Sequence, residues 1–331
     1  MSTRNILKNL AILLFVTVAI TITSFVSPSA MAANSGDFNP GNIIDDSVFF
    51  DGNSLSVTEI QSFLDSKVPV CTINNGQPSH AAGAPYYRSD GSIFTYIAST
   101  CLKNYTESTP NMGVQFSANG SQICSQYIGS NEESAAQIIS KISRACSISP
   151  KVLLVLLEKE QSLISDSWPT VKQLTEATGF ECYDNGEPCV GVNAGFFKQV
   201  WSAARQFQRY GSGTFTWYPV GQTSNILYQA NLPSCGTRSV YIENRATAAL
   251  YYYTPYTPNQ AALSNLYGTG DACSAYGNRN FWRMFTDWFG STHGGPLTQT
   301  QVYARDASGV LWLYTSRDGG VLTNRLLAGN G

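Results

Sequence analysis

Two glutamates at the end of an apolar stretch are the residues of this chain best suited to acid–base chemistry. Glu158 and Glu160 follow six consecutive apolar residues at 152–157. If this stretch is helical, Glu160 shares a face with apolar side chains, because residues three and four apart lie on the same face. Glu158 points toward a more polar edge. A carboxyl group among apolar side chains tends to keep its proton, and glycoside cleavage requires such a proton donor.

A purely structural role for the same residues is the alternative. Charged residues near helix ends usually pair with neighbouring ions or backbone donors. Lys159 lies directly before Glu160 and is one candidate partner. Periodicity alone favours this structural interpretation, so the catalytic one depends on further signals.

The helix that would position these glutamates has clear start signals. Ser149 can cap it, and Pro150 can occupy its first position, where a missing N–H costs nothing. A helix that is apolar on all sides is a buried one, and this run is too short to span a membrane. A capping box at Ser130–Glu133 predicts a preceding amphipathic helix that extends to 147. The two helices are expected to form the core of the main domain.

The stretch SPKVLLVLLEKEQS at 149–162 resembles the catalytic helix of the lysozyme-like superfamily. It is most similar to the helix of lytic transglycosylases and goose-type lysozymes. NAGFFKQV at 193–200 resembles the family segment in which glycine and an aromatic or aliphatic residue precede a glutamine. The tyrosines at 251–253 resemble the tyrosine-rich helix that often closes the family's cleft. In the family the glutamate and serine are adjacent, whereas Gln161 separates them here.

This resemblance covers about 130–256 and implies cleavage of the β-1,4 bonds of peptidoglycan glycan strands. Glu160 would be the general acid, with Glu158 as its less favoured substitute. The predicted substrate-binding residues are Trp168, Gly195, Phe196, Gln199, Tyr251 and Tyr252. Trp168 is equally compatible with packing in the core, and Gly195 with an ordinary helix start.

A hydrolase generally needs a second catalytic carboxylate. No residue stands out among the five candidates, which are Asp166, Glu176, Glu181, Asp184 and Glu187. In the transglycosylase branch that the chain resembles, one glutamate suffices, because a hydroxyl of the sugar itself closes an anhydro ring. The sequence leaves hydrolase and transglycosylase open.

Composition narrows the possible partners. The chain has 331 residues, a net charge of −2 and only 13% charged residues. Nucleic-acid binding is not expected, since no basic surface is available to hold phosphates. The 18 tyrosines and 6 tryptophans suit a secreted protein that handles peptidoglycan or another cell-surface glycan, although the same residues also build cores. Neither a metal ion nor another cofactor is expected, because no CxxC motif occurs and the chain has only two histidines.

The first 33 residues resemble a signal peptide. Arg4 and Lys8 precede an apolar region at 10–26, and Ala30-Met31-Ala32 is a small-residue cleavage site, with the cut after Ala32 or Ala33. An uncleaved membrane anchor is the alternative. Export to an oxidising compartment agrees with an even number of cysteines, eight, in the mature chain. Pairing between sequence neighbours predicts the disulfides 71–101, 124–146, 182–189 and 235–273.

The whole chain also resembles secreted actinobacterial proteins described as haemagglutinin-like, over about 38–291. A non-catalytic, carbohydrate-binding surface protein is therefore the alternative function. Alternating residues at 214–218 predict a strand, and YARDASGVLWLY at 303–314 predicts a β-hairpin that resembles one β-propeller repeat.

The expected fold is mainly α within the α+β class, with a lysozyme-like helical domain, disulfides and a short C-terminal β-hairpin repeat. Five parts of the chain are expected: a signal peptide at 1–33, an N-terminal helix and loop-rich segment at 34–129, the helical domain at 130–290, a linker at 291–300 and the repeat at 301–331. The sequence gives no prediction for the oligomeric state.

Overall fold

The computed structural model describes three main stretches, 32–73, 99–182 and 192–294, together with the backbone of the short strands at 86–87, 93–94, 299–305, 310–317 and 324–330. These residues form a helix-rich structure with small antiparallel sheets. The α+β class predicted from the sequence is therefore confirmed. The predicted signal peptide lies almost entirely outside the described residues.

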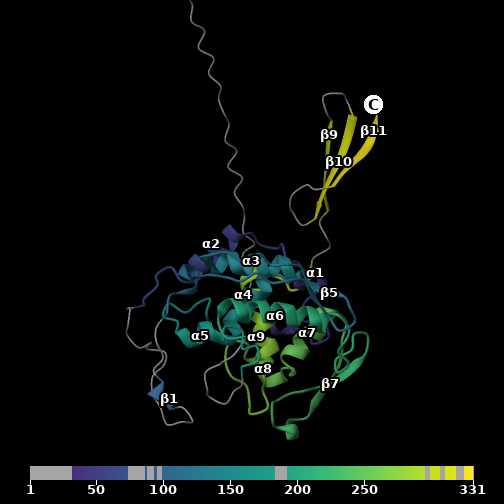
Figure 1. Ribbon diagram of the computed structural model, residues 1–331. Helices are drawn as coiled ribbons and strands as arrows, with labels where there is room; N and C mark the ends of the chain where they lie inside the picture. Colours follow the sequence, from purple (N-terminus) through teal and green to yellow (C-terminus); the bar gives the residue numbers. More distant parts are fainter. Residues whose placement is uncertain are drawn as a thin grey trace, which may run out of the picture.

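Nine α-helices lie in the described part of the chain, and Figure 1 shows how they are arranged in space. Their bounds are α1 Asp46–Phe49, α2 Val57–Lys67, α3 Ala135–Cys146, α4 Pro150–Gln161, α5 Val171–Thr175, α6 Phe196–Gly211, α7 Arg245–Tyr253, α8 Gln260–Ser264 and α9 Gly277–Phe289. Short 3-10 helices lie at Ser35–Asp37, Leu102–Asn104 and Pro233–Cys235.

The strands form separate antiparallel pairs rather than one large sheet. The pairs are β1 Tyr86–Tyr87 with β2 Ile93–Phe94, β3 Thr106–Glu107 with β6 Glu133–Ser134, β4 Gln115–Phe116 with β5 Gln122–Cys124, and β7 Thr223–Leu227 with β8 Thr237–Tyr241. Near the C-terminus, β9 Gln299–Arg305, β10 Val310–Arg317 and β11 Asn324–Asn330 form a three-stranded sheet. The predicted hairpin is the β9–β10 pair, and the sequence did not reveal its third strand.

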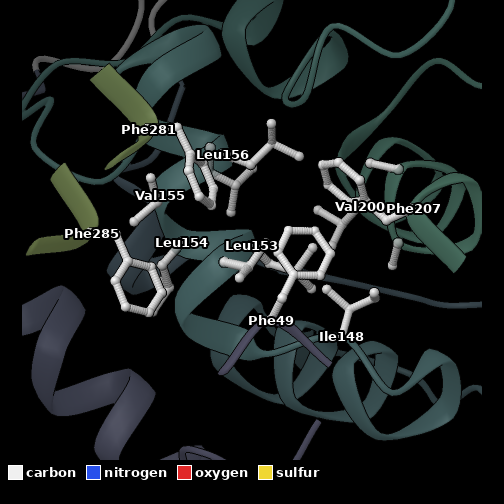
Figure 2. Packing of buried hydrophobic residues seen from close by; sticks show 14 of the residues in the cluster. Phe49, Ile148, Leu153, Leu154, Val155, Leu156, Val200, Phe207, Phe281 and Phe285 are labelled. Atoms are coloured by element: carbon white, nitrogen blue, oxygen red, sulfur yellow. The ribbon is translucent and has the colours of Figure 1, made fainter. Parts of the chain in front are cut away.

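Helix α4 lies at the centre of the hydrophobic core. All six apolar residues at 152–157 are at most 1% exposed. The helix contacts α3 and α9, and Figure 1 shows it among α3, α6 and α9. Figure 2 shows side chains from four other parts of the chain around it, namely Phe49, Ile148, Val200, Phe207, Phe281 and Phe285. Full burial of each such aliphatic side chain contributes about 1.5–3 kcal/mol, so this helix is a principal source of stability.

The start signals of the helices are partly confirmed. Pro150 occupies the first position of α4, as predicted, but the Ser149 hydroxyl bonds the Ser54 hydroxyl at 2.8 Å and does not cap the helix. The predicted capping box at Ser130–Glu133 is wrong. Helix α3 begins later, at Ala135, and its capping box joins Ser134 to Gln137.

The reason for the later start is a buried polar network around Glu133. This side chain is 5% exposed, and its carboxylate pairs with Lys141 and accepts hydrogen bonds from Thr109 and Tyr127. These partners draw Glu133 into β6, which pairs with β3. Burial alone would raise the pKa of the Glu133 carboxyl, but its three partners outweigh burial and lower the pKa.

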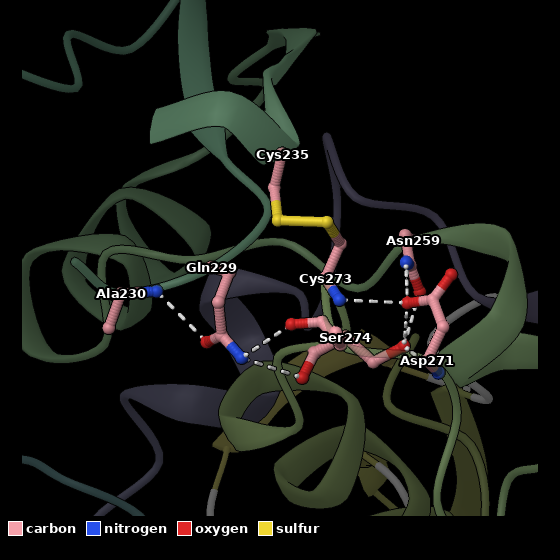
Figure 3. The surroundings of a disulfide bond; sticks show 8 residues. Gln229, Ala230, Cys235, Asn259, Asp271, Cys273 and Ser274 are labelled. Atoms are coloured by element: carbon pink, nitrogen blue, oxygen red, sulfur yellow. Dashed lines mark hydrogen bonds between the residues drawn. A yellow bond between two sulfur atoms is a disulfide. The ribbon is translucent and has the colours of Figure 1, made fainter. Parts of the chain in front are cut away.

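Three of the predicted disulfides are confirmed: Cys71–Cys101, Cys124–Cys146 and Cys235–Cys273. Cys182 is also disulfide-bonded, but its predicted partner Cys189 lies outside the described residues. Figure 3 shows that the Cys235–Cys273 bond lies beside a hydrogen-bonded turn, in which the Ser274 hydroxyl contacts the side-chain oxygens of Asn259 and Asp271 at 2.8 and 2.9 Å. The bond therefore links the end of the β7–β8 hairpin to this turn.

Replacing Glu133 with Gln should destabilise the protein at neutral pH by about 1–3 kcal/mol, since Lys141 loses its ionic partner. A carboxyl group whose pKa is lowered by folding stabilises the protein above its unfolded pKa, and this contribution disappears as the pH falls through the folded pKa. The difference between wild type and Glu133→Gln should therefore shrink with acidification. Denaturant unfolding from about pH 7 to about pH 3 measures this. Glu132→Gln, at the exposed neighbouring position, is the matched control, and an equal effect of both variants at every pH would contradict the interpretation.

Candidate functional site

Glu160 lies in the last turn of α4, at the point where the buried helix reaches the surface. Its side chain is 25% exposed. It forms an ion pair with Lys159, whose side chain is only 10% exposed. The helix ends at Gln161, and the following residue, Ser162, adopts a left-handed conformation with φ of 56°. The ion pair that the structural interpretation anticipated is therefore present, on a carboxylate that solvent can still reach.

The surroundings of Glu160 come from three segments of the chain. The Lys159 Nζ lies 3.5 Å from the Thr254 Oγ1, just after α7. The Tyr253 hydroxyl donates a 2.7 Å hydrogen bond to the Thr178 carbonyl oxygen. Gly179 has a φ of +69°, and a Cβ there would lie 3.8 Å from the Glu160 Oε2. The glutamate therefore faces a turn where glycine keeps the backbone accessible.

Tyr253 is a neutral hydrogen-bond donor in this arrangement. Burial raises the pKa of its phenol well above the usual range, and the negative charge of Glu160 raises it further. Its ring stacks on Phe207 of α6, with a distance of 4.7 Å between ring centroids. Tyr253 thus fixes the Thr178–Gly179 turn beside Glu160.

Glu158 has different surroundings and a structural geometry. Its carboxylate accepts 3.1 Å hydrogen bonds from the backbone N–H groups of Ile164 and Ser165, and a 2.6 Å bond from the Ser165 hydroxyl. These contacts hold the turn that follows α4. They occupy both carboxylate oxygens, which favours a structural role for Glu158 over its predicted role as a substitute acid.

Gln199 is buried completely and organises the loop opposite Glu160. Its Oε1 accepts hydrogen bonds from the Thr178 and Phe180 N–H groups at 3.2 and 3.1 Å. Its Nε2 donates to the carbonyl oxygens of Phe180 and Asn193 at 3.0 and 2.9 Å. A side chain with no exposed surface cannot touch a substrate, so the predicted direct contact is corrected: Gln199 positions the 178–182 loop.

Of the other predicted binding residues, two are buried in the core and one lines a surface pocket. Phe196 and Tyr251 are both fully buried, which corrects the prediction that they contact substrate. Phe196 packs on Tyr105, and the Tyr251 hydroxyl bonds the Pro40 carbonyl oxygen at 2.9 Å. Tyr252 is half-buried and lines a surface pocket.

Gly195 and Trp168 stay candidates by position. Gly195 precedes α6 with a φ of +109°, a conformation that favours glycine, and the space where a Cβ would lie is open. Trp168 is half-buried, and its backbone N–H donates to the Asp166 Oδ1 at 2.7 Å.

The candidate second carboxylates have local contacts of their own. Asp166 also accepts a 2.9 Å hydrogen bond from Gln173. Glu176 forms an ion pair with Lys172 and is 6% exposed. Glu181 accepts a hydrogen bond from the Asn193 side chain. Asp184 and Glu187 lie outside the described residues. Within the part of the chain that the structure describes, no group of three or more His, Cys, Asp or Glu side chains could hold a metal ion.

Sequence reasoning missed Glu107 in the loop-rich segment. Its Oε1 accepts a 2.8 Å hydrogen bond from the Phe197 N–H in the first turn of α6. Burial raises the pKa of this carboxyl, while the hydrogen bonds from Phe197 and Tyr105 lower it in part. Helix α6 has no side-chain cap at Gly195, so Glu107 supplies one from a distant position. No local pattern could have revealed this contact.

The comparison with protein families gives a match over most of the chain. The family model described as "LasA, N-terminal domain" matches residues 42–297. The chain belongs to this family. The match includes Glu158, Glu160 and Gln199, and it ends before β9. It gives no support to the haemagglutinin-like description or to a β-propeller repeat. Comparisons with curated proteins and with solved structures each found no match.

Replacing Gln199 with Leu should destabilise the LasA N-terminal domain fold by several kcal/mol, because each buried backbone group that loses its partner costs about 1–3 kcal/mol. Exchange of the Thr178 and Phe180 amide hydrogens should accelerate more than exchange in α4. Thermal unfolding and hydrogen exchange measure these effects. Gln260→Leu, at the exposed start of α8, is the control. Unchanged exchange at 178 and 180 would show that Gln199 does not hold the loop.

Proposed function

We propose that this protein acts on peptidoglycan and cleaves the β-1,4 bonds of its glycan strands, with Glu160 as the general acid. Membership of the LasA N-terminal domain family supports a cell-wall-active, peptidoglycan-related function. The observation that supports cleavage is the placement of Glu160. Its partly exposed carboxylate follows the fully buried run at 152–157 and lies beside a glycine turn that Gln199 and Tyr253 hold in place.

The ion pair with Lys159 defines the first step of the proposed reaction. An ionised carboxylate only accepts hydrogen bonds, so it has no proton to give to a leaving oxygen. The bound glycan must therefore separate Lys159 from Glu160, and Glu160 must take up a proton. Glu160 then protonates the glycosidic oxygen as the bond to the sugar carbon breaks. In the transglycosylase form, a hydroxyl of the same sugar attacks that carbon and returns its proton to Glu160.

Glycan binding without cleavage is the second candidate function. The same ion pair favours it, because Lys159 and Glu160 satisfy each other in the free protein. The two candidates differ in a single measurable property, the release of products.

Replacing Glu160 with Gln should reduce product release from purified peptidoglycan by about 10²–10⁴-fold, the usual contribution of a general acid. Mass spectrometry of the products distinguishes anhydro-sugars, made by a transglycosylase, from reducing ends, made by a hydrolase. Glu158→Gln is the control on the same helix and should keep its activity while losing some stability. Equal activity of wild type and Glu160→Gln would refute the assignment. If neither protein released products and both still bound the wall, the binding function would stand instead.

Export is part of this proposal. Disulfides are typical of oxidising, extracytoplasmic compartments, and three of them are described here. None of the helices in the described stretches is both long and apolar enough to span a membrane.

The surroundings of Ala33 favour one of the two predicted cleavage positions. Its backbone N donates a 2.9 Å hydrogen bond to the Asp287 Oδ1, and the residue is 8% exposed. The Tyr267 hydroxyl and the Arg283 guanidinium contact the same carboxylate at 2.9 and 3.2 Å. A cut after Ala32 would place the new α-ammonium group on Asp287. A cut after Ala33 would remove this residue from its packed position.

The secreted protein should therefore begin at Ala33, which intact-mass measurement and N-terminal sequencing establish directly. Asp287→Asn should destabilise that mature protein by about 1–3 kcal/mol, because the ammonium group loses its charged acceptor. Asp37→Asn, at an exposed position, is the control. A mature chain that starts at Asn34 would contradict this assignment.

A further inference from the structure

Aromatic side chains line two pockets beside the C-terminal end of α7. The larger has a volume of about 530 Å³ and the smaller about 350 Å³. Four residues line both pockets, so the two adjoin: Tyr210, Phe215, Tyr218 and Tyr252. Trp217 lines the smaller pocket and is 80% exposed. We call these five residues and the space between them the aromatic groove.

Contacts among its own residues hold the groove in shape. Tyr252 stacks on Tyr210, with ring centroids 5.2 Å apart and planes at 23°. Phe215 packs edge-on against Tyr210 at 4.9 Å. The Tyr218 N–H donates a 2.9 Å hydrogen bond to the Tyr252 hydroxyl, which fixes the loop that carries Trp217. A preformed site loses little conformational entropy when a ligand binds.

The groove combines ring faces with uncharged polar groups. Ser121, Gln122 and Gln208 line the larger pocket beside the aromatic residues. Burial raises the pKa values of Tyr218 and Tyr252, so both phenols are neutral at neutral pH. Among the described lining residues, the only charged one is Arg245, whose Nε is paired with the Asp46 Oδ2 at 3.1 Å.

This chemistry matches an uncharged sugar. Each pyranose ring has an apolar face that can lie on an aromatic ring, and hydroxyl and amide groups at its edge that need hydrogen-bond partners. Small-molecule sites typically combine mainly apolar walls with a few polar groups in about 300–1,000 Å³. A phosphate-rich ligand would require free cations, whereas Arg245 is paired with Asp46 and Arg209, 5.9 Å from the centre of the Phe215 ring, donates a hydrogen bond to Gln206. We propose that the aromatic groove binds uncharged pyranose rings of a glycan strand.

The position of the groove connects it to Glu160. Pro255 lines the smaller pocket. The preceding residue, Thr254, contacts Lys159, the ionic partner of Glu160. Consecutive Cα atoms lie about 3.8 Å apart, so the groove ends close to the residues around Glu160. A strand held in the groove can continue past the end of α7 to the carboxylate. The identity of the ligand rests on the proposed function, whereas its binding does not require catalysis.

Binding is tested in the full-length mature protein carrying Glu160→Gln, so that cleavage cannot change the ligand. The ligand is N,N′,N″,N‴-tetraacetylchitotetraose, an uncharged β-1,4-linked chain, and calorimetry measures its affinity. Trp217→Ala should weaken binding about tenfold, the scale of one lost aromatic contact. Trp217 is so exposed that its removal should leave the melting temperature unchanged. Phe215→Leu, which removes a ring but keeps most of its bulk, should weaken binding similarly.

Ile128→Ala, an exposed apolar position outside the groove, is the control and should bind as the parent does. Unchanged affinity in both Trp217→Ala and Phe215→Leu would overturn the proposal. So would a groove that binds a proline-rich peptide and not the oligosaccharide, since aromatic grooves also recognise such peptides. Loss of sugar binding in both variants would support the groove even if Glu160→Gln left product release unchanged, so failure of the two proposals can be told apart.

Discussion

The complete burial of the apolar run at 152–157 of α4 is the constraint on which the rest of the structure depends. A helix that is apolar on every side lowers the free energy only if other elements surround it. Helices α3 and α9 and side chains of α1 and α6 do so here. After the apolar run at 152–157, the next residues of α4 are charged or polar and only partly buried, so the helix reaches the surface there. The location of Glu160 is thus a consequence of how the core is packed.

The burial of the apolar run also gives Glu158 and Glu160 different surroundings. Glu158 faces the chain as it turns back after Ser162, and backbone N–H groups occupy it. Glu160 faces away from that turn, toward Gly179 and the end of α7. Two carboxylates only two residues apart therefore have different contacts, because they lie on different sides of one helix. Glu158 holds the turn after the helix, whereas Glu160 is partly exposed and paired with Lys159.

Features that depend on local sequence could be predicted. The start of α4 at Pro150 and the three described disulfides follow from residues that are close in the sequence. The start of α3 could not be predicted, because Thr109 and Tyr127, which draw Glu133 away from the helix, lie in other segments. The strand predicted at 214–218 is instead a loop, since Phe215 and Tyr218 pack on Tyr252 and not on a partner strand.

The positions of the candidate residues in the fold could be predicted only in part. Glu160 was recognisable because the apolar run marks its position along the chain. The role of Gln199 was not, since its partners at Thr178 and Phe180 lie on a loop that no periodic pattern describes. A glutamine in a helix can bind a ligand or hold a loop, and only its burial distinguishes the two. The resemblance predicted that Gln199 contacts substrate, whereas in the structure its side chain is buried and bonds the loop.

The three consecutive tyrosines of α7 show how one helix end connects these regions. Successive residues of a helix point about 100° apart, so the three hydroxyls reach three different segments. Tyr251 bonds Pro40 in the N-terminal segment, Tyr252 accepts from Tyr218 in the groove, and Tyr253 donates to Thr178 beside Glu160. A shift of α7 would therefore move the groove and the turn at Glu160 together. Under the proposed function, such coupling would keep the groove and the carboxylate of Glu160 at a fixed spacing, which the positioning of a reacting bond requires.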